Sequence, residues 1–183
     1  MITQNKITNN NINYKKLYFF LPFLVWILVS VFVLYYGVNN ISKLLLYVPD
    51  DSFYYFKISE NLLKGYWFSF DTITKTNGFH PLWLFVITPL IHFFGKNFSP
   101  IIILSSFFFF TGNFIFTMLI ERVSSEKYAR TFSYLISLNP LVIIFSINSL
   151  ETGLLYCIFS IFMYYIIINS FDTKIHFIIL GII

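Results

Sequence analysis

Two adjacent acidic residues, Asp50 and Asp51, stand where a long apolar segment gives way to the aromatic stretch SFYYFKISENLLKG. Acids at the boundary between membrane and water are often functional where they face a protein cavity. Such a pair can bind a divalent cation, or one carboxylate can act as a general base while the other shifts its pKa. A simpler interpretation stays open, in which Asp51 caps a helix and Asp50 is solvated.

A third acid, Glu151, begins the apolar run ETGLLYCIF. On its own it fits a first-turn residue that complements the dipole of a helix. If it lies on the same side of a membrane as Asp50 and Asp51, the three carboxylates can form a joint site. The sequence therefore indicates a candidate site built from two segments that are far apart in the chain.

Polar and aromatic side chains between these acids are candidates for binding a phosphate or a sugar. His80 and Asn77, in TNGFHPLW, can donate hydrogen bonds to either group, although a structural role for a partly exposed His80 is the alternative. The neighbouring rings can stack on a sugar or form an aromatic belt at the headgroup level. These rings belong to Trp67, Phe68, Phe70 and Phe79.

Several other kinds of site are excluded by the sequence. It has no zinc-ligand spacing, no glycine-rich phosphate loop and no nucleophile elbow. The single cysteine, Cys157, lies in an apolar run, so no internal disulfide can form. The net charge of +4 comes from Lys and Arg at segment ends, so nucleic acid is not an expected partner.

The composition is that of a membrane protein, with 57% hydrophobic and 11% charged residues; soluble domains carry about 25% charged residues. We predict an all-α fold of polytopic transmembrane helices in contact with membrane lipid. Segments that can span about 30 Å of hydrocarbon, which takes roughly 20 residues, are 17–36, 100–120, 128–147 and 150–168. A fifth segment, 175–183, is too short, and we expect a fragment or the first part of a longer protein.

With 25 Phe and 13 Tyr against 7 Gly, small-residue helix packing is not expected to dominate.

The positive charges predict which side each loop faces. Lys6, Lys15 and Lys16 assign the tail, residues 1–16, to the cytoplasm, and the next basic loop holds Arg122, Lys127 and Arg130. The apolar segment 81–94 contains Pro89 and is too short to span, so we expect it to re-enter or to lie at the interface. Residues 17–183 then form a domain in the cytoplasmic membrane, with one long external loop at 37–98 and an external turn at 148–151.

Within that loop, residues 51–65 predict an amphipathic helix lying in the membrane interface. Its expected apolar face holds Tyr55, Phe56, Ile58, Leu62 and Leu63, and its polar face holds Lys57, Glu60, Asn61 and Lys64. Asp51 suits the N-cap and Gly65 the position after the C-cap. Asn77-Gly78 is the strongest turn signal in the rest of the loop.

The stretch DDSFYYFKISENLLKGYWFSFDTITKTNGFHPLWLF resembles the first external loop of the C-type superfamily of integral-membrane glycosyltransferases. It is most similar to members related to the protein mannosyltransferases and the aminoarabinose transferases. Those loops combine an acidic pair, an aromatic amphipathic helix, a glycine turn and an element like TNG(F/Y)HPLW. The later NSLETGLLY resembles their NGxETAL element at another external turn, so the similarity extends from Asp50 to about Tyr156.

The resemblance implies a polyprenyl-phosphate-sugar donor and an external acceptor that is a glycan, a lipid or a protein. It assigns the catalytic or metal-binding role of the loop acid to Asp51 or Asp50, with a divalent cation as a possible cofactor. It also implies substrate-binding roles for Glu151, His80, Asn77 and Lys57. The chain departs from the family pattern in NSLET, because small residues usually precede the acid, and in having fewer spans than family members.

Two rival functions stay open alongside this glycosyltransferase. The first is a truncated, non-catalytic remnant or an accessory membrane subunit. The second is a transporter for lipid-linked sugars, which would use charged groups near the middle of the membrane. No charged residue lies at the middle of any of the predicted spans, so the sequence favours the enzyme over the transporter.

Overall fold

The computed structural model describes residues 14–168, and these residues form helices joined by turns and one ordered loop. The elements are η1 Tyr14–Phe19, α1 Leu21–Asn39, α2 Ile41–Leu45, α3 Asp50–Leu63, α4 Pro81–Phe94, α5 Ser99–Val123, α6 Glu126–Ser137, α7 Pro140–Ser146 and α8 Thr152–Ile168. Within this range the all-α prediction is confirmed. The predicted fifth segment, 175–183, and most of the predicted N-terminal tail lie outside the described residues.

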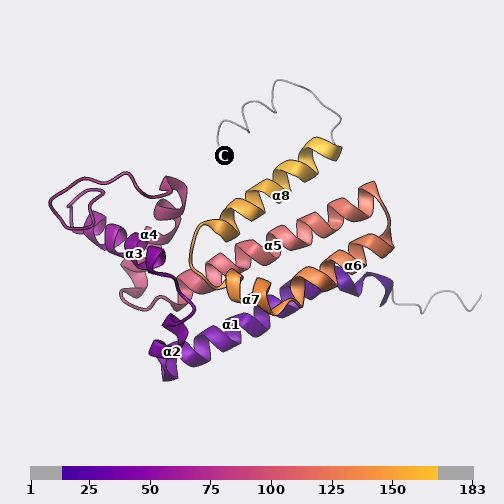
Figure 1. The fold of residues 1–183 in the computed structure, drawn as a ribbon, viewed down its shortest axis with the longest axis horizontal. Coiled ribbons are helices and arrows are strands. Elements are labelled where there is room, and N and C mark those ends of the chain that lie inside the picture. Colours follow the sequence, from indigo (N-terminus) through magenta and orange to yellow (C-terminus); the bar gives the residue numbers. More distant parts are fainter. Residues whose placement is uncertain (1–13, 169–183) are drawn as a thin grey trace, which may run out of the picture.

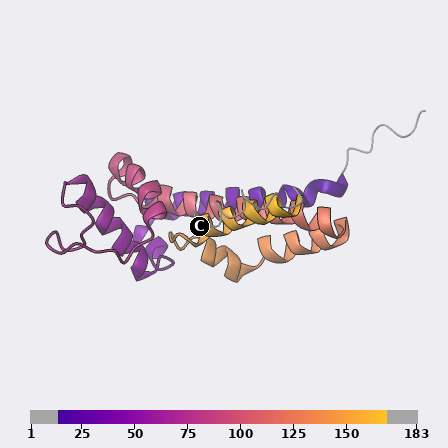
Figure 2. The same cartoon turned by 90° about the horizontal axis from the view of Figure 1, so that it is seen from above.

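Helix α5 forms the centre of the bundle, with α1, α6 and α8 packed against it (Figure 1). The end of α1 and the starts of α5 and α8 lie at one end of this bundle, together with α2, α3 and α4 (Figures 1 and 2). The connection from α5 to α6 lies at the other end. The predicted site residues therefore share one end, and the basic residues Arg122, Lys127 and Arg130 gather at the opposite one.

Small residues bring α5 and α8 into close contact. A Cβ atom added at Gly153 would overlap the carbonyl oxygen of Ser105, and one added at Gly112 would lie 3.0 Å from Cα of Cys157. Backbones can approach this closely only where side chains are absent or short. Small-residue packing was not expected to dominate the chain as a whole, and this helix pair is a place where it does occur.

Helix α5 has 25 residues and is long and apolar enough to cross a membrane. Three other apolar helical segments fall short of that length, namely Leu21–Gly37, Pro81–Phe94 and Thr152–Ile168. The structure thus provides one clearly membrane-capable helix among the described residues, and the four-span arrangement stays a prediction.

The predicted continuous span at 128–147 is wrong in form, because α6 and α7 are separate helices bent by 66°. Pro140 cannot continue the hydrogen-bond ladder of α6. Asn139 instead caps α7, its side-chain oxygen accepting a hydrogen bond from the backbone N–H of Leu141 at 2.9 Å. The two helices together are still long and apolar enough to form one broken span.

The amphipathic helix predicted at 51–65 is α3, and its buried residues include Tyr55, Phe56 and Ile58, as expected. Gly65 follows it in the left-handed conformation, with φ of +86°, which confirms its predicted position. Three details of the prediction differ: the N-cap is Pro49, so Asp50 and Asp51 form the first turn, Asn61 is buried, and Leu63 of the predicted apolar face is exposed.

Helix α4 packs against α3 through Trp83, Leu84, Ile87 and Ile91. The segment predicted to re-enter the membrane or lie at its surface is thus a 14-residue helix with Pro89 inside it. Between α3 and α4, the backbone does not turn at Asn77-Gly78 as expected. The loop turns instead at Asp71, whose carboxylate accepts hydrogen bonds from the N–H groups of Ile73 and Thr74 at 2.9 and 2.7 Å.

Candidate functional site

The turn at 148–151, here called the clamped turn, is held by three helices at once. Three successive carbonyl groups in this turn each accept a hydrogen bond from a different helix, α3, α4 or α5. The pairs are Ser52 Oγ to the carbonyl of Asn148 at 2.6 Å, Trp83 Nε1 to that of Ser149 at 3.1 Å and Ser105 Oγ to that of Leu150 at 3.2 Å. These bonds fix Glu151, the next residue, relative to the start of α3 and the start of α4.

Ser149 makes the turn in a conformation that few residues adopt. Its φ is +63°, and its side chain is fully buried. A non-glycine residue in this region costs about 1–2 kcal/mol, and such strain persists where the surroundings hold it in place. Here the indole of Trp83, itself fully buried, provides that restraint through the bond to the Ser149 carbonyl.

Tyr55 connects the predicted site residues. Its hydroxyl oxygen accepts a hydrogen bond from the backbone N–H of His80 at 2.9 Å. The pKa of Tyr55 is raised to about 12, chiefly by burial and also by the Glu151 side chain and the negative charge of Asp51, while the hydrogen bond from the His80 backbone lowers it. The Glu151 side chain therefore lies beside the Tyr55 hydroxyl.

The two adjacent acids of α3 face in different directions. Asp51 precedes Tyr55 by four residues and therefore shares its face of the helix, whereas Asp50 shares a face with Tyr54. Both carboxylates lie at exposed positions. The structure therefore brings Asp51, Tyr55, His80 and Glu151 together, and we call this group the junction. Asp50 faces away from it.

Three polar atoms around this junction are buried and have no hydrogen-bond partner among the described residues. They are Nδ1 of His80, Oγ of Ser149 and Oε2 of Glu151. Buried polar groups in folded proteins are nearly always satisfied, so each exception needs an explanation. A bound polar molecule is one way to satisfy all three.

The remaining predicted substrate-binding residues are not part of this junction. Asn77 is exposed on the loop before His80. Lys57 is half-buried on α3, two positions after Tyr55 and so roughly 200° around the helix from it. Lys57 thus lies on another face of α3 than Asp51 and Tyr55, and no hydrogen bond joins Asn77 to the group formed by Asp51, His80 and Glu151 among the described residues.

The carboxylates near Tyr55 are the candidate ligands of a cation. The described residues contain no group of three or more His, Cys, Asp or Glu side chains arranged to hold a metal ion. Asp50 and Asp51 occupy consecutive helix positions, so their side chains diverge by roughly 100°. The divalent cation therefore stays a prediction from the resemblance, and no chemical step is derived through it.

Two residues of the junction were not predicted as site residues. Tyr55 was assigned to the apolar face of α3, but its spacing of four from Asp51 was a signal that the two share a face. Ser149 occupies the position of the glycine in the NGxETAL pattern, which was a signal for a backbone with positive φ. Nothing in the sequence marked Trp83 as the donor to this turn.

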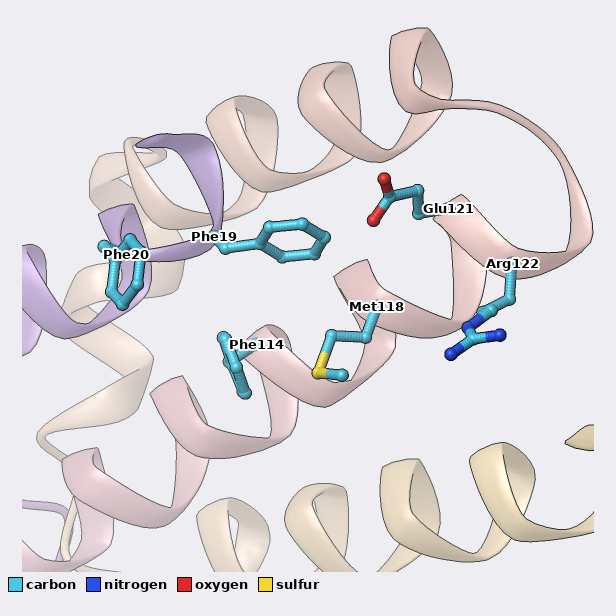
Figure 3. Close-up of a pocket in the computed structure, with 6 residues that line it drawn as sticks. All are labelled: Phe19, Phe20, Phe114, Met118, Glu121 and Arg122. Atoms are coloured by element: carbon cyan, nitrogen blue, oxygen red, sulfur yellow. The ribbon is translucent and has the colours of Figure 1, made fainter. Parts of the chain in front are cut away.

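The described structure also has a cavity of about 560 Å³ at the opposite end of the bundle, between η1 and the end of α5. Figure 3 shows its residues, with Glu121 directed toward the side of Phe19. It contains none of the predicted site residues and belongs to the basic end of the molecule. We therefore keep the junction at Tyr55 as the candidate site.

Comparison of the chain with known protein families, with curated proteins and with solved structures finds no match in any of the three.

Proposed function

We propose that this protein is part of an inverting membrane glycosyltransferase that transfers a sugar from a polyprenyl phosphate to an external acceptor. The observation that carries the proposal is the junction itself. Asp51 and Glu151 come from the two motifs that resemble this superfamily, and both carboxylates lie near enough to Tyr55 to raise its pKa. Two motifs far apart in the chain that meet at one point are expected of a shared site.

In the proposed reaction, Asp51 acts as the general base. The acceptor hydroxyl oxygen attacks the anomeric carbon of the sugar, and its proton passes to the Asp51 carboxylate. The bond between the anomeric carbon and the phosphate oxygen breaks, and its electron pair leaves with the polyprenyl phosphate. Inversion at the anomeric carbon follows from this single displacement.

We assign substrate-binding roles to His80, Ser149 and Glu151, because each has a buried polar atom without a hydrogen-bond partner among the described residues. His80 Nδ1 and Ser149 Oγ can each hydrogen-bond a sugar hydroxyl or a phosphate oxygen, and Glu151 Oε2 can accept from a sugar hydroxyl. Since Trp83 and Ser52 fix the turn that carries Ser149 and Glu151, these groups are preorganised before the substrate arrives. Asn77 and Lys57 remain candidates for contacts farther from the reacting atoms.

An apolar groove beside the junction suits the hydrocarbon chain of the donor. It has a volume of about 400 Å³. Its lining comes from α1, from α7 and from the segments next to them, namely Val25, Leu28, Val29, Phe32, Tyr47, Leu138, Ile143, Ile144 and Ile147. Tyr47 lies just before the acidic pair and Ile147 just before the clamped turn, so a chain in this groove would bring its phosphate near Asp51.

The same proposal includes the arrangement in the membrane. Helices α1, α5, the bent pair α6–α7, and α8 would be the four spans, with α4 at the interface. The basic end of the bundle, with Arg122, Lys127 and Arg130, would face the cytoplasm. The candidate site would then open on the external side, at the level of the lipid headgroups.

The proposal is tested by measuring sugar transfer in membranes that contain the whole protein. Labelled polyprenyl-phosphate sugars are supplied as donors, and transfer to endogenous acceptors is followed with the wild type and with the combined Asp50→Asn and Asp51→Asn variant. We expect the wild type to transfer label and the double variant to lose transfer. Unchanged transfer by the double variant at equal protein level would refute the function.

A further inference from the structure

The loop between α3 and α4 exposes apolar side chains at its outer part, residues 66–76, here called the distal loop. Ile73 is 87% exposed, Trp67 64% and Phe70 45%. The sequence offered no reason to distinguish the four aromatic rings of this region, but the structure shows that two are half-buried and two are exposed. Phe68 and Phe79 are half-buried and pack against each other at 5.1 Å, whereas Trp67 and Phe70 are exposed.

The distal loop is held rigidly in this exposed form. The buried amide of Asn61 donates hydrogen bonds to the carbonyls of Ser69 and Phe70 at 2.8 and 2.9 Å. The N–H of Thr76 donates to the carbonyl of Phe68 at 2.8 Å, which closes the base of the loop. The apolar side chains are thus presented by a fixed backbone.

The tip of the loop is fixed in its own right. The Asp71 carboxylate accepts three hydrogen bonds, two of them from backbone N–H groups, and these hold its pKa well below the usual range. Trp67 and Thr72 adopt positive φ values of 58° and 69°. Such backbone strain at non-glycine residues persists only where the surroundings impose it.

The distal loop begins after the end of α3 and folds back along this helix. Phe70 stacks on Tyr54, with ring centres 5.0 Å apart, and the hydroxyl groups of Tyr54 and Thr76 are hydrogen-bonded at 2.8 Å. The loop is thus joined to the first half of α3, which also carries Asp51 and Ser52, and Ser52 is bonded to the clamped turn. Figures 1 and 2 both show the loop projecting from the molecule on the side away from α8. A contact made by the loop would therefore support the helix that carries Asp51 through Tyr54 as well as through the end of the helix.

We propose that the distal loop inserts Trp67, Phe70 and Ile73 into the headgroup region of the membrane that α5 crosses, so that α3 is held at a fixed depth. Tryptophan favours this region because its ring is apolar and its N–H is polar. Exposed Lys64 and Lys75 flank the loop, and Nζ of Lys75 lies 5.4 Å from the centre of the Trp67 ring. Cations in these positions suit the phosphates of lipid headgroups.

The chemistry of the loop favours a lipid over a sugar. The most exposed side chain, Ile73, offers no hydrogen bond, and the only carboxylate of the distal loop, on Asp71, is held against the loop by three hydrogen bonds to its Oδ1. Sugar sites need free polar groups around an aromatic ring, because each hydroxyl must exchange its bonds to water for bonds to protein. An aliphatic tip between aromatic rings and lysines matches the boundary between headgroups and acyl chains.

Fluorescence quenching tests this depth directly. The whole protein carrying Ile73→Cys in a Cys157→Ala background is labelled with an environment-sensitive dye and reconstituted into phosphatidylcholine–phosphatidylglycerol vesicles. Lipids brominated near the headgroup end of their acyl chains quench dyes in the membrane, and iodide quenches dyes in water. We expect strong quenching by brominated lipid and several-fold weaker quenching by iodide than at an aqueous position.

Val31→Cys on α1 and Lys127→Cys on α6, both exposed in the structure, serve as the lipid and water references. A dye at Ile73 that behaves like the one at Lys127 overturns the inference and indicates that the loop faces water, a glycan or another protein. Phe70→Cys gives a second reading from the same loop. The quenching experiment does not measure sugar transfer. Its outcome can therefore be distinguished from success or failure of the proposed function.

Discussion

At the level of single residues, Tyr55 distinguishes between two neighbouring acids. It shares a helix face with Asp51 and accepts a hydrogen bond from the backbone of His80, and Glu151 lies close to its hydroxyl. Because the tyrosine stays protonated at physiological pH, it can donate its own hydrogen to a carboxylate or a substrate oxygen. Its role is to position other groups, and Asp51 is left as the base.

Replacing Tyr55 by Phe should change how stability depends on pH. In the folded chain the pKa of Tyr55 is raised from 10.0 to about 12, so as pH rises past 10 the unfolded chain loses this proton first. The folded state of the wild type should therefore lose stability between pH 10 and 12, and Tyr55→Phe should lose less. Thermal unfolding in detergent across this range measures the difference, and parallel curves would contradict it.

Ser149→Gly should stabilise the protein. Glycine adopts a positive φ without steric cost, and the change also removes a buried hydroxyl that has no partner among the described residues. We expect a gain of about 1 kcal/mol after the added flexibility of the unfolded chain is included. Denaturant unfolding tests this, and a loss of stability would show that the Ser149 hydroxyl makes a bond that compensates for the strain.

At the level of elements, the contact between α5 and α8 sets the position of Glu151. Gly153, two residues after Glu151, lies against the backbone of Ser105, and the hydroxyl of Ser105 holds the carbonyl of Leu150. The start of α8 and the clamped turn are thus one unit with α5. Any side chain added at Gly153 would push the start of α8, and with it Glu151, away from α5.

Gly153→Ala should destabilise the fold by about 1–3 kcal/mol, because the new methyl group overlaps a backbone oxygen that cannot easily move. Gly78→Ala is a matched control, since a Cβ there would meet its nearest atom at 3.7 Å and the φ of Gly78 is not positive. It should change stability by less than about 0.5 kcal/mol. Equal unfolding temperatures for the two variants would contradict the close helix contact.

The sequence predicted the helices better than it predicted their breaks and contacts. The amphipathic pattern of α3 and the short apolar run of α4 both correspond to helices in the structure. The pattern did not show the break between α6 and α7, because hydropathy continues across Asn139 and Pro140 while the backbone does not. It also did not show that Asn61 turns inward, since a polar residue is buried only when distant carbonyls satisfy it.

The candidate site was predictable in its members but not in its geometry. Asp51, His80 and Glu151 were recognised by type and by motif, but their meeting point depends on tertiary hydrogen bonds from Ser52, Trp83 and Ser105. Those bonds join residues separated by 45 to 96 positions, and no local pattern encodes them. Asp51 and Asp50 are separated by the geometry of α3 itself, since consecutive helix positions face in different directions; the sequence only slightly favoured Asp51.

At the level of the whole molecule, charge and architecture agree on two distinct ends. The candidate site lies at the end where α5 and α8 begin, and Arg122, Lys127 and Arg130 lie at the end where α5 finishes. If the basic end faces the cytoplasm, the site faces outward. This is the side on which the proposed reaction needs its acceptor.

Cysteine labelling should reveal this orientation. In a Cys157→Ala background, Lys96→Cys lies in the exposed turn between α4 and α5, and Lys127→Cys lies at the basic end. A membrane-impermeant thiol reagent added to intact cells should label position 96 and leave position 127 unlabelled until the membrane is opened. The reverse pattern would contradict the orientation of the whole molecule.

The most direct test of the central claim is sugar transfer by the two single variants Asp51→Asn and Asp50→Asn in the same membranes. The geometry predicts that Asp51→Asn lowers transfer by about 10²–10⁴-fold, as expected for loss of a general base. Asp50→Asn, one residue away but on another face of α3, should stay within a few-fold of the wild type. Equal losses in both variants, or a greater loss with Asp50→Asn, would contradict the account.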